Sequence, residues 1–138
     1  MEINNRTVRL NERPNGLPEK KIWSFNEENF DLKLDDNQFI IKNEFISLDP
    51  AMRGWLNDAR SYIKPVNVGD VMRAGTVGKI IKSNNKYFNE GDYVSGWGGV
   101  QDYTITNGEN FQKINDDKVA KESYLGVLGM PGFTAYFG

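Results

Sequence analysis

The residue types that most often carry catalysis and metal binding are only partly represented in this chain. Its 138 residues include no histidine and no cysteine. Ser-His-Asp and Cys-His catalysis, disulfides and the common zinc sites are therefore excluded, because each depends on an imidazole or a thiolate group. We predict that the chain binds no metal. The candidates that remain for chemistry are paired carboxylates, one arginine and a cluster of glycines.

Two aspartate pairs and the glycine cluster could each be interpreted as a binding site. Asp35-Asp36 and Asp116-Asp117 lie in polar turns without a convergent third ligand, so we interpret them as solvated turns rather than cation sites. Gly96, Gly98 and Gly99 lie between two expected strands. Because a phosphate site needs a helix N-terminus directly after its glycines, this cluster is interpreted as a tight turn.

Arg53 is the remaining charged candidate. It could guide an anionic substrate or a cofactor phosphate. A cation that follows Asp49 in the chain more often forms a local ion pair of modest strength. We favour this structural role.

The charge balance argues against a nucleic-acid or membrane partner. The chain has 17 basic and 19 acidic residues and a net charge of -2, and its longest basic run is Lys20-Lys21. Binding to nucleic acid or to an anionic membrane would require a basic patch. The N-terminus has no apolar signal segment, and no later run reaches membrane-spanning length. We expect a soluble, cytoplasmic protein whose partner is a small molecule or another protein.

The sequence pattern predicts many short strands followed by helix. Segments with alternating or β-branched and aromatic residues predict strands over 7–10, 22–25, 30–34, 39–48, 71–81, 93–97, 100–105 and 111–114. The glycines within 71–81 indicate a bulge, a bend or a close approach of the backbone. A single helical turn is expected over 51–56, with Asp49 as its cap and Pro50 in its first position. This order is typical of a mainly β barrel or sandwich with short helices.

The end of the chain is apolar and punctuated by glycine. Gly129 could end one helix, and Pro131 could lie in the first turn of the next, which would have scarcely two turns. We divide the chain into a β domain over 1–115 and a helical segment over 116–138, truncated before a further domain. The second helix would expose an apolar stripe, and we expect the stripe to pair two copies into a symmetric homodimer. Its members are Met130, Phe133, Tyr136 and Phe137.

Several motifs resemble one known family in the same order and at similar spacing. They are Ser47-Leu48-Asp49-Pro50-Ala51-Met52-Arg53-Gly54, Gly75-Thr76-Val77-Gly78, Gly91-Asp92-Tyr93-Val94, Gly96-Trp97-Gly98-Gly99-Val100-Gln101-Asp102-Tyr103 and the segment 126–136. Together they resemble the zinc-independent medium-chain dehydrogenases/reductases, in the branch of leukotriene B4 dehydrogenases, prostaglandin reductases and alkenal double-bond reductases. The resemblance implies a GroES-like, partly open β-barrel whose C-terminal helices lead to an absent Rossmann domain.

The resemblance also implies an activity. It is the NADP(H)-dependent reduction of activated C=C bonds in enones and alkenals, or of quinones, by hydride transfer. Such a transfer needs alignment of the nicotinamide and stabilisation of the developing enolate. Tyr62 matches a substrate-facing tyrosine that would polarise the carbonyl, and Met130 and Thr134 match contacts on the nicotinamide side. The alternatives are a Tyr62 buried against Trp55 and plain helix packing for Met130 and Thr134.

Two positions depart from the family pattern. Ala51 stands where plant double-bond reductases often have tyrosine, and Gly75 occupies the position of another of their pocket tyrosines. These departures predict a wider pocket. Zinc-dependent relatives take a cysteine and a histidine from the region that matches 47–53 and slightly beyond, where this chain has neither.

A different class of function stays open. A stand-alone GroES-like barrel could serve as a binding or interaction module without catalysis, because a fold alone does not decide function. In either case we expect the 138 residues alone to be inactive as a reductase, since the cofactor would need the missing second domain.

Overall fold

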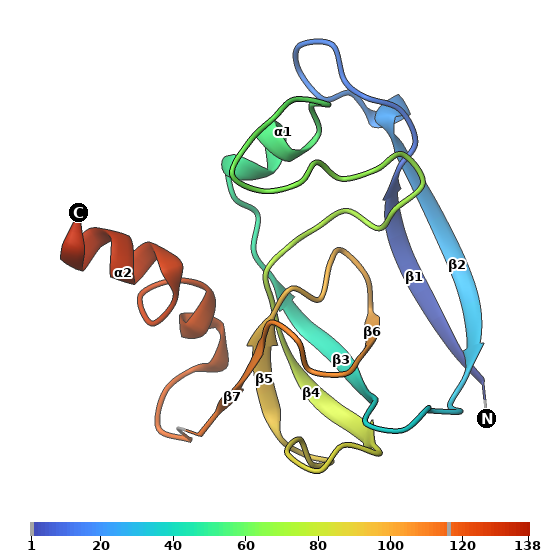
Figure 1. Ribbon diagram of the computed structural model, residues 1–138, viewed down its shortest axis with the longest axis vertical. Helices are drawn as coiled ribbons and strands as arrows, with labels where there is room; N and C mark the ends of the chain where they lie inside the picture. Colours follow the sequence, from blue (N-terminus) through green and yellow to red (C-terminus); the bar gives the residue numbers. More distant parts are fainter. Residues whose placement is uncertain (1, 116) are drawn as a thin grey trace.

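The computed structural model describes residues 2–115 and 117–138 (Figure 1). The strands are β1 (Glu2–Leu10), β2 (Trp23–Asp31), β3 (Phe39–Ile46), β4 (Thr76–Ser83), β5 (Tyr93–Gly96), β6 (Tyr103–Thr106) and β7 (Phe111–Ile114). The helices are α1 (Ala51–Trp55), α2 (Met130–Phe137) and the 3₁₀ helices η1 (Lys20–Ile22) and η2 (Lys121–Leu125). The prediction of a mainly β fold with short helices is confirmed.

The strands form two antiparallel sheets. β1 and β2 make a two-stranded sheet, and the five-stranded sheet has the order β6-β3-β4-β5-β7. β2 is a single strand, whereas the sequence predicted two strands over 22–25 and 30–34. The polar residues between those segments continue the strand because each pairs with a residue of β1, and a ribbon with a solvated face tolerates polar side chains.

Two isolated bridges join the small sheet to the large one. Thr7 of β1 pairs with Gln101, which precedes β6, and Arg9 pairs with Val71, which precedes β4. β1 therefore lies between β2 and the five-stranded sheet. Within the described residues no ladder connects β2 with β7. The partly open barrel that the resemblance implied is confirmed.

The segment predicted as one strand over 71–81 changes partners part-way along. Val71 bridges to β1, whereas β4 begins at Thr76 and pairs with β3 and β5. Gly78, within β4, packs against the backbone of β3 beside a register shift between Asn43 and Phe45, and a side chain there would overlap the carbonyl oxygen of Lys42. Of the alternatives expected for these glycines, the close approach of the backbone is confirmed at Gly78, whereas the single long strand was wrong.

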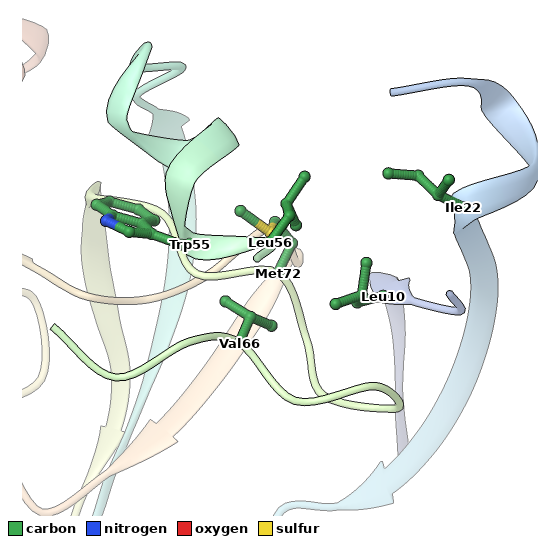
Figure 2. Packing of buried hydrophobic residues seen from close by; sticks show 6 residues of the cluster. All are labelled: Leu10, Ile22, Trp55, Leu56, Val66 and Met72. Atoms are coloured by element: carbon green, nitrogen blue, oxygen red, sulfur yellow. The ribbon is translucent and has the colours of Figure 1, made fainter. Parts of the chain in front are cut away.

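Two apolar clusters form the interior. The first joins β1, η1, α1 and the loop after α1, and Figure 2 shows its side chains meeting from these separate elements. Its members are Leu10, Ile22, Trp55, Leu56, Val66 and Met72. The second lies in the five-stranded sheet and consists of Phe39, Ile41, Ile80 and Val94, with Phe88 and Phe111 packed against it.

Paired charges fasten β1 to its neighbours. The Arg6 guanidinium makes two hydrogen bonds to the Asp102 carboxylate, of 2.7 and 3.1 Å, and lowers the pKa of Asp102 below its ordinary value. Arg9 binds Glu28 across the β1–β2 pair in the same way, with both bonds at 2.8 Å, and lowers the pKa of Glu28. These pairs are partly exposed to solvent, so each adds only modest stability.

The C-terminal segment differs from its prediction at both helices. The first helical piece is the 3₁₀ helix η2, which begins at Lys121 and ends at Leu125, with Gly126 as its C-cap. Gly129 is the N-cap of α2 rather than the end of a helix: its φ of -116° is not left-handed, and a side chain there would overlap the Tyr124 carbonyl. Pro131 lies in the first turn of α2, as predicted.

The other turn predictions have mixed outcomes. Pro50, not Asp49, occupies the N-cap position of α1, and no side-chain cap forms; instead the Asp49 carbonyl accepts a hydrogen bond from the Met52 N–H at 3.0 Å. Asp116 lies outside the described residues, while Asp117 pairs with Lys121 at 3.4 Å.

None of the described helices has the length and apolar character needed to cross a membrane.

Candidate active site

Helix α1 is held firmly although it has only five residues. Trp55 and Leu56 at its end are 6% and 2% exposed and anchor it in the first apolar cluster. The Trp55 carbonyl accepts a hydrogen bond from the Val66 N–H at 2.9 Å, and the Leu56 carbonyl accepts one from Arg13 Nη1 at 2.8 Å. The carbonyls that a helix leaves unpaired at its C-terminus thus find partners elsewhere in the fold.

An aromatic pair lies where α1 meets the end of β5. The rings of Trp55 and Trp97 are 5.6 Å apart and meet edge to face at 78°. The guanidinium of Arg73 lies 5.4 Å from the centre of a Trp55 ring and donates a hydrogen bond to the Lys64 carbonyl at 2.8 Å. Trp97 is 47% exposed, so the pair has one solvent-facing ring supported by a buried one. This pair was not predicted from the sequence, because its two members come from separate elements.

Tyr62 lies in the loop between α1 and β4 and is 86% exposed. The alternative in which Tyr62 is buried against Trp55 is wrong, because a side chain that is 86% exposed is not buried. The Tyr62 hydroxyl makes no hydrogen bond to the described residues. Hydrogen bonds from Arg73 to the Lys64 carbonyl and from the Val66 N–H to the Trp55 carbonyl anchor this loop, so an exposed phenol lies on an anchored loop.

The two residues expected on the nicotinamide side lie on one face of α2. Met130 and Thr134 are four residues apart, which places them one above the other on the helix surface. Both are exposed, and α2 contains no buried residue, so plain packing does not account for them in the described part of the chain. No hydrogen bond or ring contact of the described residues joins Tyr62 to α2. The structure brings Met130 and Thr134 together and leaves Tyr62 on a separate loop.

The position of Gly75 has room for a side chain. A Cβ atom built there would lie 3.7 Å from the Leu125 side chain and 3.8 Å from the Ser47 side chain, which are ordinary contacts. Gly75 therefore lies between Leu125 of η2 and Ser47, directly after β3. Ala51, the other departure from the family pattern, is exposed on α1.

The glycine cluster is the tight turn that was predicted. Gly99 has a φ of +77°, which favours glycine. The Gly98 N–H donates to the Thr76 hydroxyl at 3.1 Å, and the Gly98 carbonyl accepts bonds from Gln101 and Thr104, both at 2.8 Å. Because Trp97 directly precedes Gly98, the same bonds hold the main chain next to the exposed tryptophan.

Asn43 completes the network from β3. Its Nδ2 donates to the Gln101 carbonyl at 3.0 Å and to the Thr104 hydroxyl at 2.9 Å, while its buried Oδ1 has no partner among the described residues. Sequence reasoning missed this residue. An asparagine in the middle of the most apolar strand was the signal that could have revealed it, because a buried amide needs hydrogen-bond partners.

Arg53 has the structural role that was favoured, with different partners. It donates to the Gly16 carbonyl from Nε at 3.0 Å and from Nη2 at 2.7 Å, and to Asn57 Oδ1 at 2.8 Å. The predicted ion pair with Asp49 is wrong. Asp49 lies before the helix begins, so its side chain is not on the helical face that Arg53 shares with the residue four positions later.

Neither a metal site nor a deep pocket accompanies these groups. Residues 2–115 and 117–138 contain no group of three or more acidic side chains placed to hold a metal ion. A shallow hollow of about 270 Å³ lies over β1 and β2 beside Val68 and Gly69, and the Arg9–Glu28 pair lines it. Its lining includes neither Tyr62 nor the Trp55–Trp97 pair.

Residues 6–114 match the family described as the N-terminal domain of oxidoreductase. The chain belongs to this family. The match covers the barrel from β1 to the end of β7 and includes α1, Tyr62 and the Trp55–Trp97 pair.

Curated relatives agree with this assignment. The chain is 42% identical, over 97% of its length, to an NADPH-dependent curcumin reductase of Escherichia coli, and covers 39% of that protein. It is 33% identical, over 99% of its length, to a 2-alkenal reductase (NADP(+)-dependent) of Nicotiana tabacum, and covers 41% of it. The chain thus spans about two fifths of the length of these relatives. The resemblance to the zinc-independent reductase branch is confirmed.

Solved structures give the same fold. CurA from Vibrio vulnificus matches with a TM-score of 0.87 at 36% identity, over 96% of this chain and 39% of that one. CurA in complex with NADPH matches with a TM-score of 0.86 at 35% identity, with the same coverage.

We predict that Gly98→Ala destabilises the fold by about 1–3 kcal/mol, the usual cost of overpacking a filled interior. The new methyl group would overlap the Thr76 hydroxyl and lie 2.7 Å from Asn43 Oδ1. The measurement is the free energy of unfolding in urea. Gly54→Ala is the matched control: it lies in α1 with nothing within 4 Å, so it should leave stability unchanged or raise it. Equal stabilities of the two variants would contradict the account of the turn.

Proposed function

We propose that this chain is the N-terminal catalytic part of an NADP(H)-dependent oxidoreductase that reduces activated C=C bonds of enones and alkenals, or quinones. The main support is the 42% identity with an NADPH-dependent curcumin reductase across nearly the whole chain. The similarity to CurA in complex with NADPH supports NADP(H) as the cofactor. In this proposal residues 1–115 form the barrel domain and 116–138 the segment that leads to the rest of the enzyme.

The features of the described residues fit a shared cofactor site. The face of α2 that carries Met130 and Thr134 is open to a ligand. None of the described helices follows a strand through a glycine-rich loop, which is the usual phosphate site for a dinucleotide. This chain would therefore supply only part of the contacts to NADP(H), and residues outside it the others.

Each candidate residue has a defined task in this proposal. NADPH, when bound, supplies the hydride. The Tyr62 hydroxyl donates a hydrogen bond to the carbonyl oxygen of the substrate, where negative charge develops as the β-carbon is reduced. Met130 and Thr134 hold the nicotinamide ring at the distance that transfer requires. No metal is needed, because the hydrogen-bond donor stabilises the enolate oxygen.

The exposed ring of Trp97 suits a large, flat substrate. Aromatic rings prefer stacked or edge-to-face partners, which a supported tryptophan can offer. We therefore favour conjugated substrates with an aromatic or extended planar group over short alkenals.

An NADPH oxidation assay tests the proposed function. The 138-residue chain alone and the same chain extended by a nucleotide-binding domain are each mixed with NADPH and an enone, an alkenal or a quinone. We expect the extended protein to consume NADPH and the short chain to be silent. A folded extended protein that binds NADPH but reduces none of the three substrates would favour the alternative, a binding module without catalysis.

We predict that Tyr62→Phe in the extended protein lowers kcat/KM by about 10- to 1000-fold, because one donor to a developing oxyanion is lost. NADPH affinity should be nearly unchanged, since the residue is expected to face the substrate. Tyr87→Phe is the matched control, because Tyr87 is similarly exposed, at 79%, in the loop between β4 and β5. An unaltered rate for Tyr62→Phe with several enones would remove Tyr62 from the mechanism.

We also propose that the 138-residue chain, when neither NADP(H) nor a further domain covers α2, forms a homodimer through the apolar face of this helix. Phe133, Tyr136 and Phe137 are 61%, 83% and 76% exposed, and burying one such side chain contributes roughly 1.5–3 kcal/mol. Sedimentation should show a dimer for the 138-residue chain and a monomer for Phe133→Asp or a chain ending at Lys121. Leu17→Asp, which changes an equally exposed apolar residue in the loop after β1, should stay dimeric. Monomers throughout would contradict the proposal.

A further inference from the structure

The chain contains two Asn-Gly pairs, Asn15-Gly16 and Asn107-Gly108, in exposed turns. The side-chain amide of an asparagine can be lost when the next main-chain nitrogen attacks it, and a following glycine offers the least steric hindrance. We infer that Asn15 is a site of spontaneous deamidation, and that the fold protects Asn107 from the same reaction.

The reaction needs only water as a co-reactant. The deprotonated nitrogen of Gly16 attacks the side-chain carbonyl carbon of Asn15; a new C–N bond forms, the bond to the amide nitrogen breaks, and ammonia leaves. Water then opens the resulting cyclic imide at either carbonyl carbon. The products are aspartate and isoaspartate, each with one additional negative charge.

The groups that must react at Asn15 are free to move. The Asn15 side chain is exposed and, like the Gly16 N–H, makes no hydrogen bond to the described residues. Gly16 has a φ of +80°, and no described atom lies within 4 Å of the position that a side chain would take. Arg53 restrains the Gly16 carbonyl, but no hydrogen bond among the described residues holds the two groups that must meet, the Gly16 N–H and the Asn15 side-chain amide.

At Asn107 both reacting groups, the side-chain amide and the Gly108 nitrogen, are held by hydrogen bonds. Its Oδ1 accepts a hydrogen bond from the Glu109 N–H at 3.1 Å, and the Gly108 N–H donates to the Thr106 hydroxyl at 3.1 Å. Gly108 also packs against the Phe88 ring, 2.5 Å from where a Cβ atom would lie. Reaction at Asn107 therefore requires local opening of the turn.

Deamidation at Asn15 would act on helix α1 through Arg53. Arg53 donates two hydrogen bonds to this loop, and the Gly16 carbonyl accepts both, at 3.0 and 2.7 Å. Isoaspartate adds a main-chain carbon directly before Gly16, which displaces this carbonyl from the guanidinium. The modification thus loosens the attachment of the loop to α1.

Peptide mapping by mass spectrometry during storage at mildly alkaline pH tests the inference. In the folded chain we expect the acid and isoaspartate forms at Asn15 to accumulate at least ~10-fold faster than at Asn107, because only Asn107 must open first. In denaturant the two rates should converge. Equal rates in the folded chain, or a rate difference that persists in denaturant, would overturn the inference.

A stability measurement tests the link to α1. The melting temperature of stored protein should fall below that of fresh protein, whereas Asn15→Gln, which forms the imide far more slowly, should retain its melting temperature over the same storage. A stored protein with converted Asn15 and an unaltered melting temperature would overturn the role assigned to Arg53.

Discussion

The space beside the α-carbon of Gly98 is occupied by the Thr76 hydroxyl and the Asn43 amide oxygen, and much of the molecule depends on this close approach. Because Gly98 has no side chain, its main chain packs closely against β3 and β4. Its N–H donates a hydrogen bond to the Thr76 hydroxyl, and its carbonyl accepts one from the Thr104 hydroxyl. Gln101, three residues later, then meets Thr7 of β1. One turn thus connects the two sheets of the barrel.

The position of the candidate site follows from this connection. Trp97 leaves β5 immediately before the turn and meets Trp55 at the end of α1, so the tightly packed turn and the first apolar cluster support the same aromatic pair. The groups expected to contact ligands lie outside this rigid part. Tyr62 is on an anchored loop, and Met130 and Thr134 are on a helix without buried residues. A rigid barrel with exposed contact groups suits a site that is completed by further residues.

The agreement between sequence and structure is best where information is local. β3 and β5–β7 were predicted near their observed positions, because alternation and β-branched content report directly on a pleated surface. The helical segment at the C-terminus was predicted less well. The residue type alone does not distinguish a glycine that permits a close approach of the backbone from a glycine that ends a helix. Gly129 is of the first kind. The aromatic pair and the Asn43 network were missed for a related reason: their members come from separate elements.

The sequence by itself determined which chemistry is absent, the mainly β class and the family. The lack of histidine and cysteine removes whole mechanisms whatever the fold, and motifs in a fixed order identify a family before any contact is known. Only the tertiary structure decided that Val71 leaves the line of β4 to meet β1, that Arg53 holds Gly16, and that Asn5 bonds to Gln101, 96 positions away. The physical reason is that a local pattern records which face of an element is apolar or polar. Which segment covers this face depends on packing among segments that are distant in the sequence. There, one hydrogen bond or the absence of one methyl group decides between arrangements that the local pattern does not distinguish.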